Sequence, residues 1–307
     1  MSRNAILVIG SANMDLVVST QRFPQPGETL FGNKFGMYPG GKGANQAVAA
    51  AKLGGEVYFL GKMGNDLFRE KLCVGMRNDG VQLDHLLIDP NESTGMALIT
   101  VDSNGQNEIV VVSGSNMNLS PADIVSKRAL FAVAKIVLLQ LEIPLDTVTQ
   151  SARLAKEHGA TVILNPAPAR ELPQELLRLV DYLTPNETEA ELLTKQAVHD
   201  QTSAQTAAMK LLAQGVKNVI LTLGEKGALL VNHEKAELFP AKKVQAVDTT
   251  AAGDAFNGAL AFSLANDKTV EEAIRFANTV AAYSATKMGA QSSMPTMKDV
   301  TQTAGLE

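Results

Sequence analysis

Residues 248–256 read Asp-Thr-Thr-Ala-Ala-Gly-Asp-Ala-Phe, a run of small residues that leads directly into a helical pattern and decides the fold. Apolar residues recur every four positions from Phe256 to Leu264, so the pattern predicts a helix that begins near Ala252 or Gly253. The N–H groups in the first turn of a helix have no partner within the helix, and the helix dipole adds positive charge there. Because the side chains around this turn are small, the sequence predicts a site that an anion can approach closely.

Asp254 stands inside this expected anion site, and the motif allows two interpretations of it. A carboxylate beside a bound phosphate suits a base that takes a proton from an attacking hydroxyl group. An acidic residue in the first turn also stabilises a helix without any catalytic role. The motif alone does not separate the two interpretations, and the other motifs of the chain favour the base.

Length and composition are those of a soluble globular protein with a large core: the chain has 307 residues, of which 45% are hydrophobic and 19% are charged. The 27 Lys and Arg residues against 32 Asp and Glu residues give a formal charge of −5, and no basic cluster occurs, which argues against a nucleic-acid partner. No apolar run approaches the roughly 18 residues that cross a bilayer, so we expect a cytoplasmic protein with no membrane partner. The single cysteine, Cys73, excludes an internal disulfide, and the dispersed histidines support neither a zinc site nor a histidine-based triad.

Short β-branched runs alternate with longer amphipathic runs along most of the chain. This alternation predicts an α/β fold with a doubly wound, mostly parallel sheet that is covered by helices on both faces. The expected strands span residues 6–9, 57–60, 136–139, 161–164, 182–184 and 219–223. The expected helices span residues 44–53, 66–78, 145–158, 186–193, 203–214 and 253–265.

Two segments break this alternation and predict a small second sheet. Residues 16–35 begin with alternating apolar side chains, pass through two prolines and a glycine, and become strand-like again at 29–31. Residues 95–112 read as two strands joined by the turn sequence Asp-Ser-Asn-Gly at 102–105, which is typical of a hairpin.

We expect these segments, about 14–38 and 94–113, to form a β lid over the strand ends of a single domain that covers residues 1–307. The apolar residues on the lid strands need a partner surface that the helices of the main sheet, which are already occupied, cannot supply. The sequence therefore predicts a homodimer formed through the lids, with the contact made by alternating pairs such as Leu16 with Val18 and Ile109 with Val111.

The run Pro-Gly-Gly-Lys-Gly-Ala-Asn-Gln at 39–46 enters the first long helix with no bulky side chain before Gln46, so it is a second helix N-terminus that a ligand can approach. Its spacing from Gly36 nearly matches a phosphate-binding P-loop, but Gly43 stands where that loop needs a Ser or Thr hydroxyl for magnesium. We therefore exclude a P-loop. The first strand is followed by Gly-Ser-Ala-Asn at 10–13 and not by G-x-G-x-x-G, which argues against a nicotinamide-dependent enzyme.

Polar residues follow the strands at their carboxyl ends, where parallel sheets bind ligands. Asn13 and Asp15, together with Lys42 and Asn45 from the glycine-rich loop, suit a polyhydroxylated ligand, although turn formation explains Asn13 equally well. Glu142 follows another strand, so it either points into the same cleft or is a solvated loop residue.

Two further motifs follow strands later in the chain. Asn186 suits the N-cap of a helix, and Glu189 lies on the same helix face, where the pair could hold phosphate oxygens and a magnesium ion that keeps its waters. Residues 222–227, Thr-Leu-Gly-Glu-Lys-Gly, predict a hairpin turn, which either covers a nucleotide or is only a turn.

Taken together, these motifs resemble the ribokinase-like carbohydrate kinases over essentially the full length of the chain. The glycine-rich run 40–45 and the run 248–254 match the two signatures of that family, and Asn186-x-x-Glu189 lies between them. The resemblance implies an ATP-dependent kinase that phosphorylates D-ribose at O5 and uses Mg²⁺ and K⁺. Further phrases typical of the family occur at 139–142, 165–169 and 244–248.

The resemblance also implies a role for each matching position. Asp254 resembles the base that deprotonates the sugar 5-hydroxyl group, and the N–H groups of Ala251, Ala252 and Gly253 resemble the hole that neutralises charge on the transferring phosphoryl group. The positions that match ribose-binding residues are Asn13, Asp15, Gly41, Lys42, Asn45 and Glu142. Those for ATP are Asn186, Thr222, Gly224, Glu225, Lys226, Gly227, Gly253 and Asn278, with Glu189 acting on magnesium. Those for the monovalent cation, some through backbone carbonyls, are Asp248, Thr250, Ser284, Lys287, Gly289 and Ser293.

Two other functions remain open from the sequence. A kinase for 2-deoxyribose, or for another pentose or a nucleoside, would use the same loops. Asn13 argues against 2-deoxyribose, because a buried amide facing a missing hydroxyl group costs about 1–3 kcal/mol. A non-catalytic sugar or nucleotide sensor would keep the fold, but it would have no need of an acid at Asp254.

Overall fold

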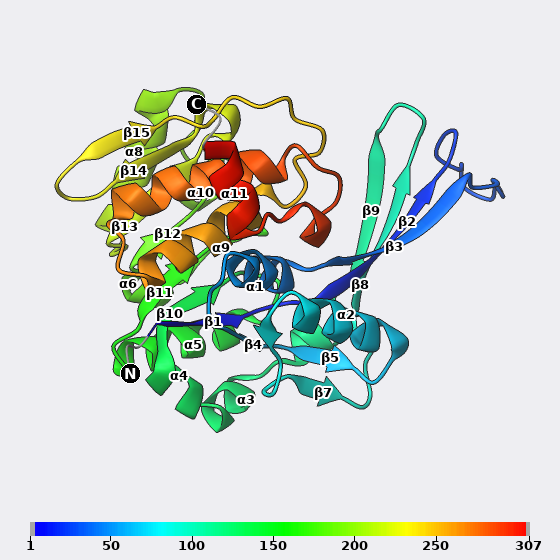
Figure 1. The fold of residues 1–307 in the computed structure, drawn as a ribbon, viewed down its shortest axis with the longest axis horizontal. Coiled ribbons are helices and arrows are strands. Elements are labelled where there is room, and N and C mark those ends of the chain that lie inside the picture. The colour runs from blue at the N-terminus through cyan, green and yellow to red at the C-terminus, as the bar shows by residue number, and fades with distance from the viewer. Residues whose placement is uncertain (1–3, 305–307) are drawn as a thin grey trace.

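A nine-stranded sheet forms the centre of the molecule (Figure 1). The computed structural model describes residues 4–304. The strand order is β15-β14-β13-β12-β11-β10-β1-β4-β6, and neighbouring strands are parallel except at β14, which runs antiparallel to both of its neighbours. The strands are β1 (Ala5–Ile9), β4 (Val57–Leu60), β6 (Val81–Gln82), β10 (Ala134–Leu139), β11 (Thr161–Leu164), β12 (Tyr182–Leu183), β13 (Asn218–Thr222), β14 (Ala228–Val231) and β15 (Ala236–Phe239).

Helices cover both faces of this sheet, which confirms the predicted doubly wound α/β fold. Strand β1 shows why: Ile6 and Val8 pack into the hydrophobic core on one face, whereas Leu7 and Ile9 pack into the core on the other. The first core includes residues of α1 (Lys42–Lys52), α2 (Leu67–Asn78), α9 (Ala252–Ala265), α10 (Val270–Ser284) and α11 (Met297–Ala304). The second includes residues of α3 (Pro121–Ser126), α4 (Ala129–Val133), α5 (Leu145–Glu157), α6 (Gln174–Leu179), α7 (Glu187–Thr194) and α8 (Gln201–Ala213).

A separate four-stranded sheet projects from the main body, as Figure 1 shows at the right. Its order is β3-β2-β8-β9, and the β8–β9 hairpin turns at 102–105 as the sequence predicts. The expected strand at 29–31 is wrong: this stretch is exposed loop, closed by an ion pair between Arg22 and Glu28, and the next strand begins at Lys34. The strands are β2 (Asn13–Ser19), β3 (Lys34–Gly40), β8 (Gly95–Val101) and β9 (Asn107–Val112).

All the predicted helices and the predicted strands of the main sheet are present, with ends within two residues of those expected. The prediction omitted helices α3, α4, α6, α10 and α11. Thr269 and Glu272 form a capping box at the start of α10, so that helix carried a readable signal. It also omitted strand β14, the edge strands β15 and β6, and a two-stranded sheet of β5 (Lys62–Gly64) and β7 (Leu87–Asp89). No helix within residues 4–304 is long and apolar enough to cross a membrane.

Candidate active site

Helices α1 and α9 cross so closely that their N-terminal ends meet, and a glycine permits this contact. A Cβ atom on Gly258 of α9 would lie 2.6 Å from the Cβ of Ala49 and 2.8 Å from the backbone oxygen of Gln46. Any larger side chain would therefore push the helices apart. The two runs that the sequence singles out, one before each helix, come together because of this crossing.

Asp254 lies at this meeting point and is buried. Nδ2 of Asn45 donates to its Oδ2 over 2.9 Å, and Nε2 of Gln46 donates to its Oδ1 over 2.9 Å. Burial raises the pKa of Asp254, while the ammonium of Lys42 and the two amide donors act in the opposite direction. A buried carboxylate that accepts two hydrogen bonds and has a raised pKa is suited to act as a base.

The first turn of α9 opens toward solvent beside this carboxylate. Ala251 takes a left-handed conformation with φ 61°, which starts the helix abruptly. A Cβ added to Gly253 would meet no atom within 4 Å, so there is room for a ligand. The N–H of Ala252, which was expected to face the anion, instead donates to the carbonyl of Thr249 over 3.2 Å. Within residues 4–304 neither the Ala251 N–H nor the Gly253 N–H has a hydrogen-bond partner, so two of the three predicted anion donors are unpaired.

The residues predicted to hold a sugar lie where the chain leaves β1 and where it enters α1. Gly41 has φ +87°, and a Cβ there would lie 2.7 Å from Cα of Ala12, so only glycine fits this turn. The turn lets the N–H of Lys42 donate to Oε2 of Glu142 over 2.9 Å. Glu142 therefore points into the site and is not a solvated loop residue.

Asn13 and Asp15 begin β2 on the same side of the site. Nδ2 of Asn116 donates to Oδ1 of Asn13 over 2.7 Å, so the Asn13 side chain has its amide N–H groups left to offer a ligand. Burial, together with the nearby charge of Glu142, raises the pKa of Asp15 to about 6. Two carboxyl groups and an amide in one small space suit a ligand rich in hydroxyl groups.

Lys42 lies between the sugar-side residues and a large cavity, which it helps to line. Burial by itself lowers the pKa of Lys42, but the carboxylates of Asp254, Glu142 and Glu189 outweigh this effect and raise it. The ammonium group therefore stays charged at neutral pH and balances acids on both sides of the site.

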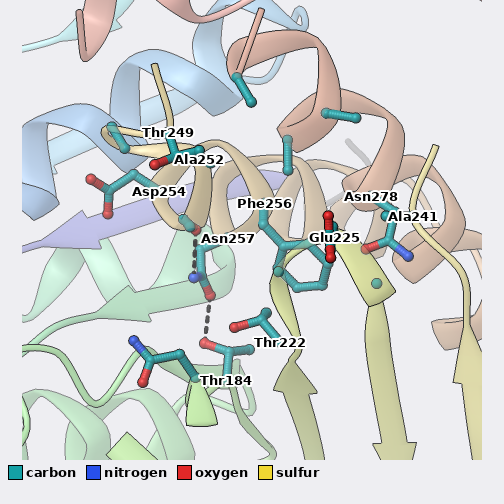
Figure 2. Close-up of a pocket in the computed structure, with 18 of the residues that line it drawn as sticks. Thr184, Thr222, Glu225, Ala241, Thr249, Ala252, Asp254, Phe256, Asn257 and Asn278 are labelled. Carbon is teal, nitrogen blue, oxygen red and sulfur yellow. Dashed lines mark hydrogen bonds between the residues drawn. The ribbon is translucent and has the colours of Figure 1, made fainter. Parts of the chain in front are cut away.

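The cavity has a volume of about 1080 Å³ and opens beside the start of α9 (Figure 2). Every position predicted to contact ATP lines it, although these positions come from α7, β13, the hairpin after β13, α9 and α10. Nδ2 of Asn278 donates to the carbonyl of Phe239 over 2.9 Å and so ties α10 to the end of β15. The lining residues that were predicted are Asn186, Glu189, Thr222, Gly224, Glu225, Lys226, Gly227, Gly253 and Asn278.

Asn186 and Glu189 form a capping box at the start of α7, which confirms the predicted N-cap. The backbone N–H and Nδ2 of Asn186 donate to the two carboxylate oxygens of Glu189 over 2.9 and 3.1 Å. Each oxygen keeps a lone pair, so Glu189 can still accept from water. Within the described residues there is no cluster of three or more His, Cys, Asp or Glu side chains that could hold a metal. The donor set fits a magnesium ion that keeps its waters and is held mainly by nucleotide phosphates.

The positions predicted for a monovalent cation gather beside the start of α9 but do not line the cavity. The N–H of Gly289 donates to Oδ2 of Asp248 over 2.8 Å, and the hydroxyls of Ser284 and Ser293 are 2.7 Å apart. Thr250 donates its N–H to Oδ1 of Asp248 over 2.9 Å. The Asp248 carboxylate and the two serine hydroxyls are oxygen groups of the kind that bind monovalent cations. The ammonium of Lys287 is not one of them, since it lies over the ring of Tyr283, 4.5 Å from the ring centroid.

The sequence reasoning missed several buried polar residues around the site. Asn116 orients Asn13, and Gln46 holds Asp254. Asn165 directly follows β11 and Thr184 directly follows β12. The rule that ligands bind at the carboxyl ends of parallel strands could therefore have found both residues. Asn116 has no such signal, because it comes from a short 3₁₀ turn far away in the sequence.

Comparison with known proteins identifies the family of the chain. The family model for pfkB family carbohydrate kinases matches residues 3–297, and the chain belongs to that family. It is 44% identical to the ribokinase of Haemophilus influenzae, with 97% of each chain covered. It is also 41% identical to a deoxyribokinase of Salmonella typhi, covering 95% of this chain and 96% of that one. Its fold matches that of Arabidopsis thaliana ribokinase, solved with ribose and ATP, with a TM-score of 0.93, 36% identity and 98% of each chain covered.

Proposed function

We propose that this carbohydrate kinase transfers the γ-phosphoryl group of ATP to O5 of D-ribose, giving D-ribose 5-phosphate and ADP. One observation carries the proposal: Asp254 lies between two sets of ligand-binding groups. Its carboxylate bonds to Asn45 on the sugar side, while the helix turn that carries it lines the nucleotide-sized cavity. A base at this junction can touch the acceptor hydroxyl while the phosphoryl group lies against the helix N-terminus.

The transfer needs little covalent chemistry from the protein. Asp254 takes the proton of the 5-hydroxyl group as the oxygen attacks the γ-phosphorus, and the bond between that phosphorus and the bridging oxygen of ADP breaks. The Gly253 N–H and the dipole of α9 stabilise the negative charge that develops on the transferring group. Lys42 keeps its charge because acids surround it, and it neutralises charge between the two substrates.

Two ions complete the proposed site. Magnesium bound to the ATP phosphates neutralises charge on them, and Glu189 would hold its waters. A potassium ion would be held by the oxygens of residues 248–250 and 284–293, with Lys287 contributing only its backbone carbonyl. Because this loop adjoins the first turn of α9, ordering it would also order the anion site.

The small sheet is proposed to act as a lid on a single domain and as the homodimer interface. Asp15 on β2 pairs in register with Ala97 on β8, and Ala97 pairs with Val111 on β9, so all three side chains lie on one face of that sheet. Closing this face over the site would keep out water, which would otherwise compete with ribose as the acceptor. The acidic charge, the absence of a basic cluster and the lack of an apolar run of membrane-spanning length support a cytoplasmic enzyme that binds neither nucleic acid nor membranes.

A kinase for 2-deoxyribose is the second candidate, and the deoxyribokinase relative favours it. The orientation of Asn13 argues for ribose. Its amide N–H groups need an acceptor, and a missing hydroxyl would leave them unpaired at a cost of about 1–3 kcal/mol.

ATP consumption, measured with magnesium and potassium against a panel of pentoses, hexoses and nucleosides, tests the proposal. We expect kcat/KM for D-ribose to exceed that for 2-deoxyribose by about tenfold or more. A higher value for 2-deoxyribose would assign the protein to the second candidate. Ligand binding without ATP consumption on any acceptor would indicate a sensor.

A further inference from the structure

Three neighbouring strands of the main sheet each end in a buried polar residue beneath α9. Gln140 follows β10, Asn165 follows β11 and Thr184 follows β12. All three are nearly or fully buried, and Gln140 is entirely so. Polar groups are costly at such a depth unless they are hydrogen-bonded, so their alignment calls for an explanation.

Hydrogen bonds join these residues into one path that reaches the proposed base. Nε2 of Gln140 donates to Oε1 of Gln46 over 2.7 Å. Nε2 of Gln46 then donates both to Oδ1 of Asn165 over 3.1 Å and to Oδ1 of Asp254 over 2.9 Å. Gln46 is 0% exposed, so it reaches Asp254 without touching any substrate.

The same path continues to the backbone of the helix turn. Nδ2 of Asn165 donates to the carbonyl of Thr184 over 3.2 Å, and the Thr184 hydroxyl donates to Oδ1 of Asn257 over 2.6 Å. Nδ2 of Asn257 donates to the carbonyl of Gly253 over 2.8 Å, and Figure 2 shows these last two bonds as dashed lines. Both the base and the first turn of α9 are therefore anchored to the ends of the sheet strands.

The direction of these bonds follows from the Asp254 carboxylate, which only accepts, so Gln46 turns its Nε2 to Asp254 and its Oε1 to the Nε2 of Gln140. Oε1 of Gln140 is the one buried side-chain polar atom within residues 4–304 that has no hydrogen-bond partner. It packs against Gly10, where an added Cβ would lie only 2.1 Å away. The amide thus keeps its oxygen unpaired while its nitrogen donates to Gln46. If that amide were turned around, two oxygens would face each other, and Gln46 would have to turn its own oxygen toward Asp254.

We propose that Gln46, oriented by Gln140, is a positioning residue that keeps Asp254 ionised and aimed at the acceptor hydroxyl. The effect of Gln46 on catalysis rests on the proposed kinase function. Its effect on the ionisation of the Asp254 carboxyl group does not depend on that function. A donor to a carboxylate stabilises the charged form, so losing it adds to the effect of burial and makes Asp254 harder to ionise.

The test compares Gln46→Leu, Gln46→Glu and Gln140→Leu with the parent protein. Gln46→Leu is expected to move the acidic limb of the kcat profile up by about one to two pH units. At neutral pH kcat then falls and recovers as the pH rises, while the KM for ribose changes less than about twofold. Gln46→Glu should move the limb further, because two adjacent carboxyl groups resist ionising together. Gln140→Leu should move it less and in the same direction.

Thr147→Val is the matched control. It removes a buried side-chain bond, from Oγ1 of Thr147 to the carbonyl of Leu119 over 2.6 Å, in the core on the other face of the sheet. It should lower the melting temperature and leave the pH profile unchanged. If kcat of the Gln46 variants is lower than that of the parent by the same factor at every pH, Gln46 has only a structural role and the proposal is overturned.

A direct titration separates this proposal from the proposed function. The Asp254 carboxyl signal can be followed by ¹³C NMR in the substrate-free protein and assigned by its loss in Asp254→Asn. A higher pKa for Asp254 in Gln46→Leu supports the positioning role even if ribose proves to be the wrong acceptor. An unchanged pKa overturns it even if the parent phosphorylates ribose.

Discussion

Asn45 of α1 donates through Nδ2 to Oδ2 of Asp254 of α9 over 2.9 Å, so a residue of the glycine-rich run holds the proposed base of the second signature run. More than 200 residues separate the two in sequence. Their contact joins the sugar side of the site to the phosphate side, and it makes Asp254 the residue on which the proposed chemistry depends.

Replacing Asp254 with Asn should lower kcat about 10²–10⁴-fold, because the amide keeps the shape of the side chain and loses its basicity. The protein should still fold, because the Asn amide fills the same space, but its nitrogen faces one of the two amide donors, so some loss of melting temperature is expected. Coupled ATP consumption and thermal unfolding measure the two effects. Turnover near the parental rate would show that Asp254 only stabilises the helix.

The affinity for ribose should depend on the ionisation of Asp15. Its pKa is raised to about 6 by burial and by the charge of Glu142, so the carboxylate that accepts sugar hydroxyls is lost as the pH falls through about 6. The KM for ribose should therefore rise between pH 7 and pH 5, and in Asp15→Asn the KM should be higher but should no longer vary over this range. A parental KM that is flat from pH 7 to pH 5 would contradict this role.

The same carboxyl group should make the protein less stable at neutral than at acid pH. Because its folded-state pKa lies above the usual 3.8, the stability it contributes is present below about pH 4 and is lost as the pH rises through about 6. Relative to Asp15→Asn, the substrate-free parent should lose unfolding free energy between these pH values. Denaturant unfolding of both proteins at several pH values measures this difference, and parallel pH curves would argue against it.

Activity should require magnesium, and it should be higher in potassium than in sodium or choline salts of equal ionic strength. The carbonyl and hydroxyl oxygens around Asp248 and Ser284 suit a large monovalent ion, and they adjoin the anion site. Initial rates at saturating ATP and ribose in the three chloride salts make the comparison. Equal rates in all three would remove the cation site.

Val111→Asp should weaken the proposed dimer and raise the KM for ribose. Val111 is exposed and lies on the sheet face that carries Asp15, so the new charge would be buried in any contact made there. Val110→Asp places the same charge at an exposed position on the opposite face of the same strand and serves as the control. Sedimentation velocity and ribose titrations measure both effects. A variant that stays dimeric with an unchanged KM would exclude this face, and a monomeric parent would exclude the dimer.

Much of the fold could be predicted because its signals are local. Strands such as 57–60 and helices such as 145–157 follow from periodicity within one segment, and buried parallel strands read as continuous apolar runs. The errors have local causes as well. Thr29 to Phe31 have strand-forming residues but no neighbouring strand to pair with, and β14 and β15 are short strands whose pairing depends on a hairpin.

The sequence by itself determined the chemistry available to this protein: two small-residue helix starts, an acid in one of them, and polar residues after strands. Each of these features depends only on which residues are adjacent in the chain. Only the tertiary structure decided that Asp254 is held by Gln46 and that Gln46 is oriented by Gln140, since these side chains come from α9, α1 and the end of β10. No local pattern encodes that contact, because it exists only where Gly258 lets two helices cross closely enough for buried amides to reach a carboxylate.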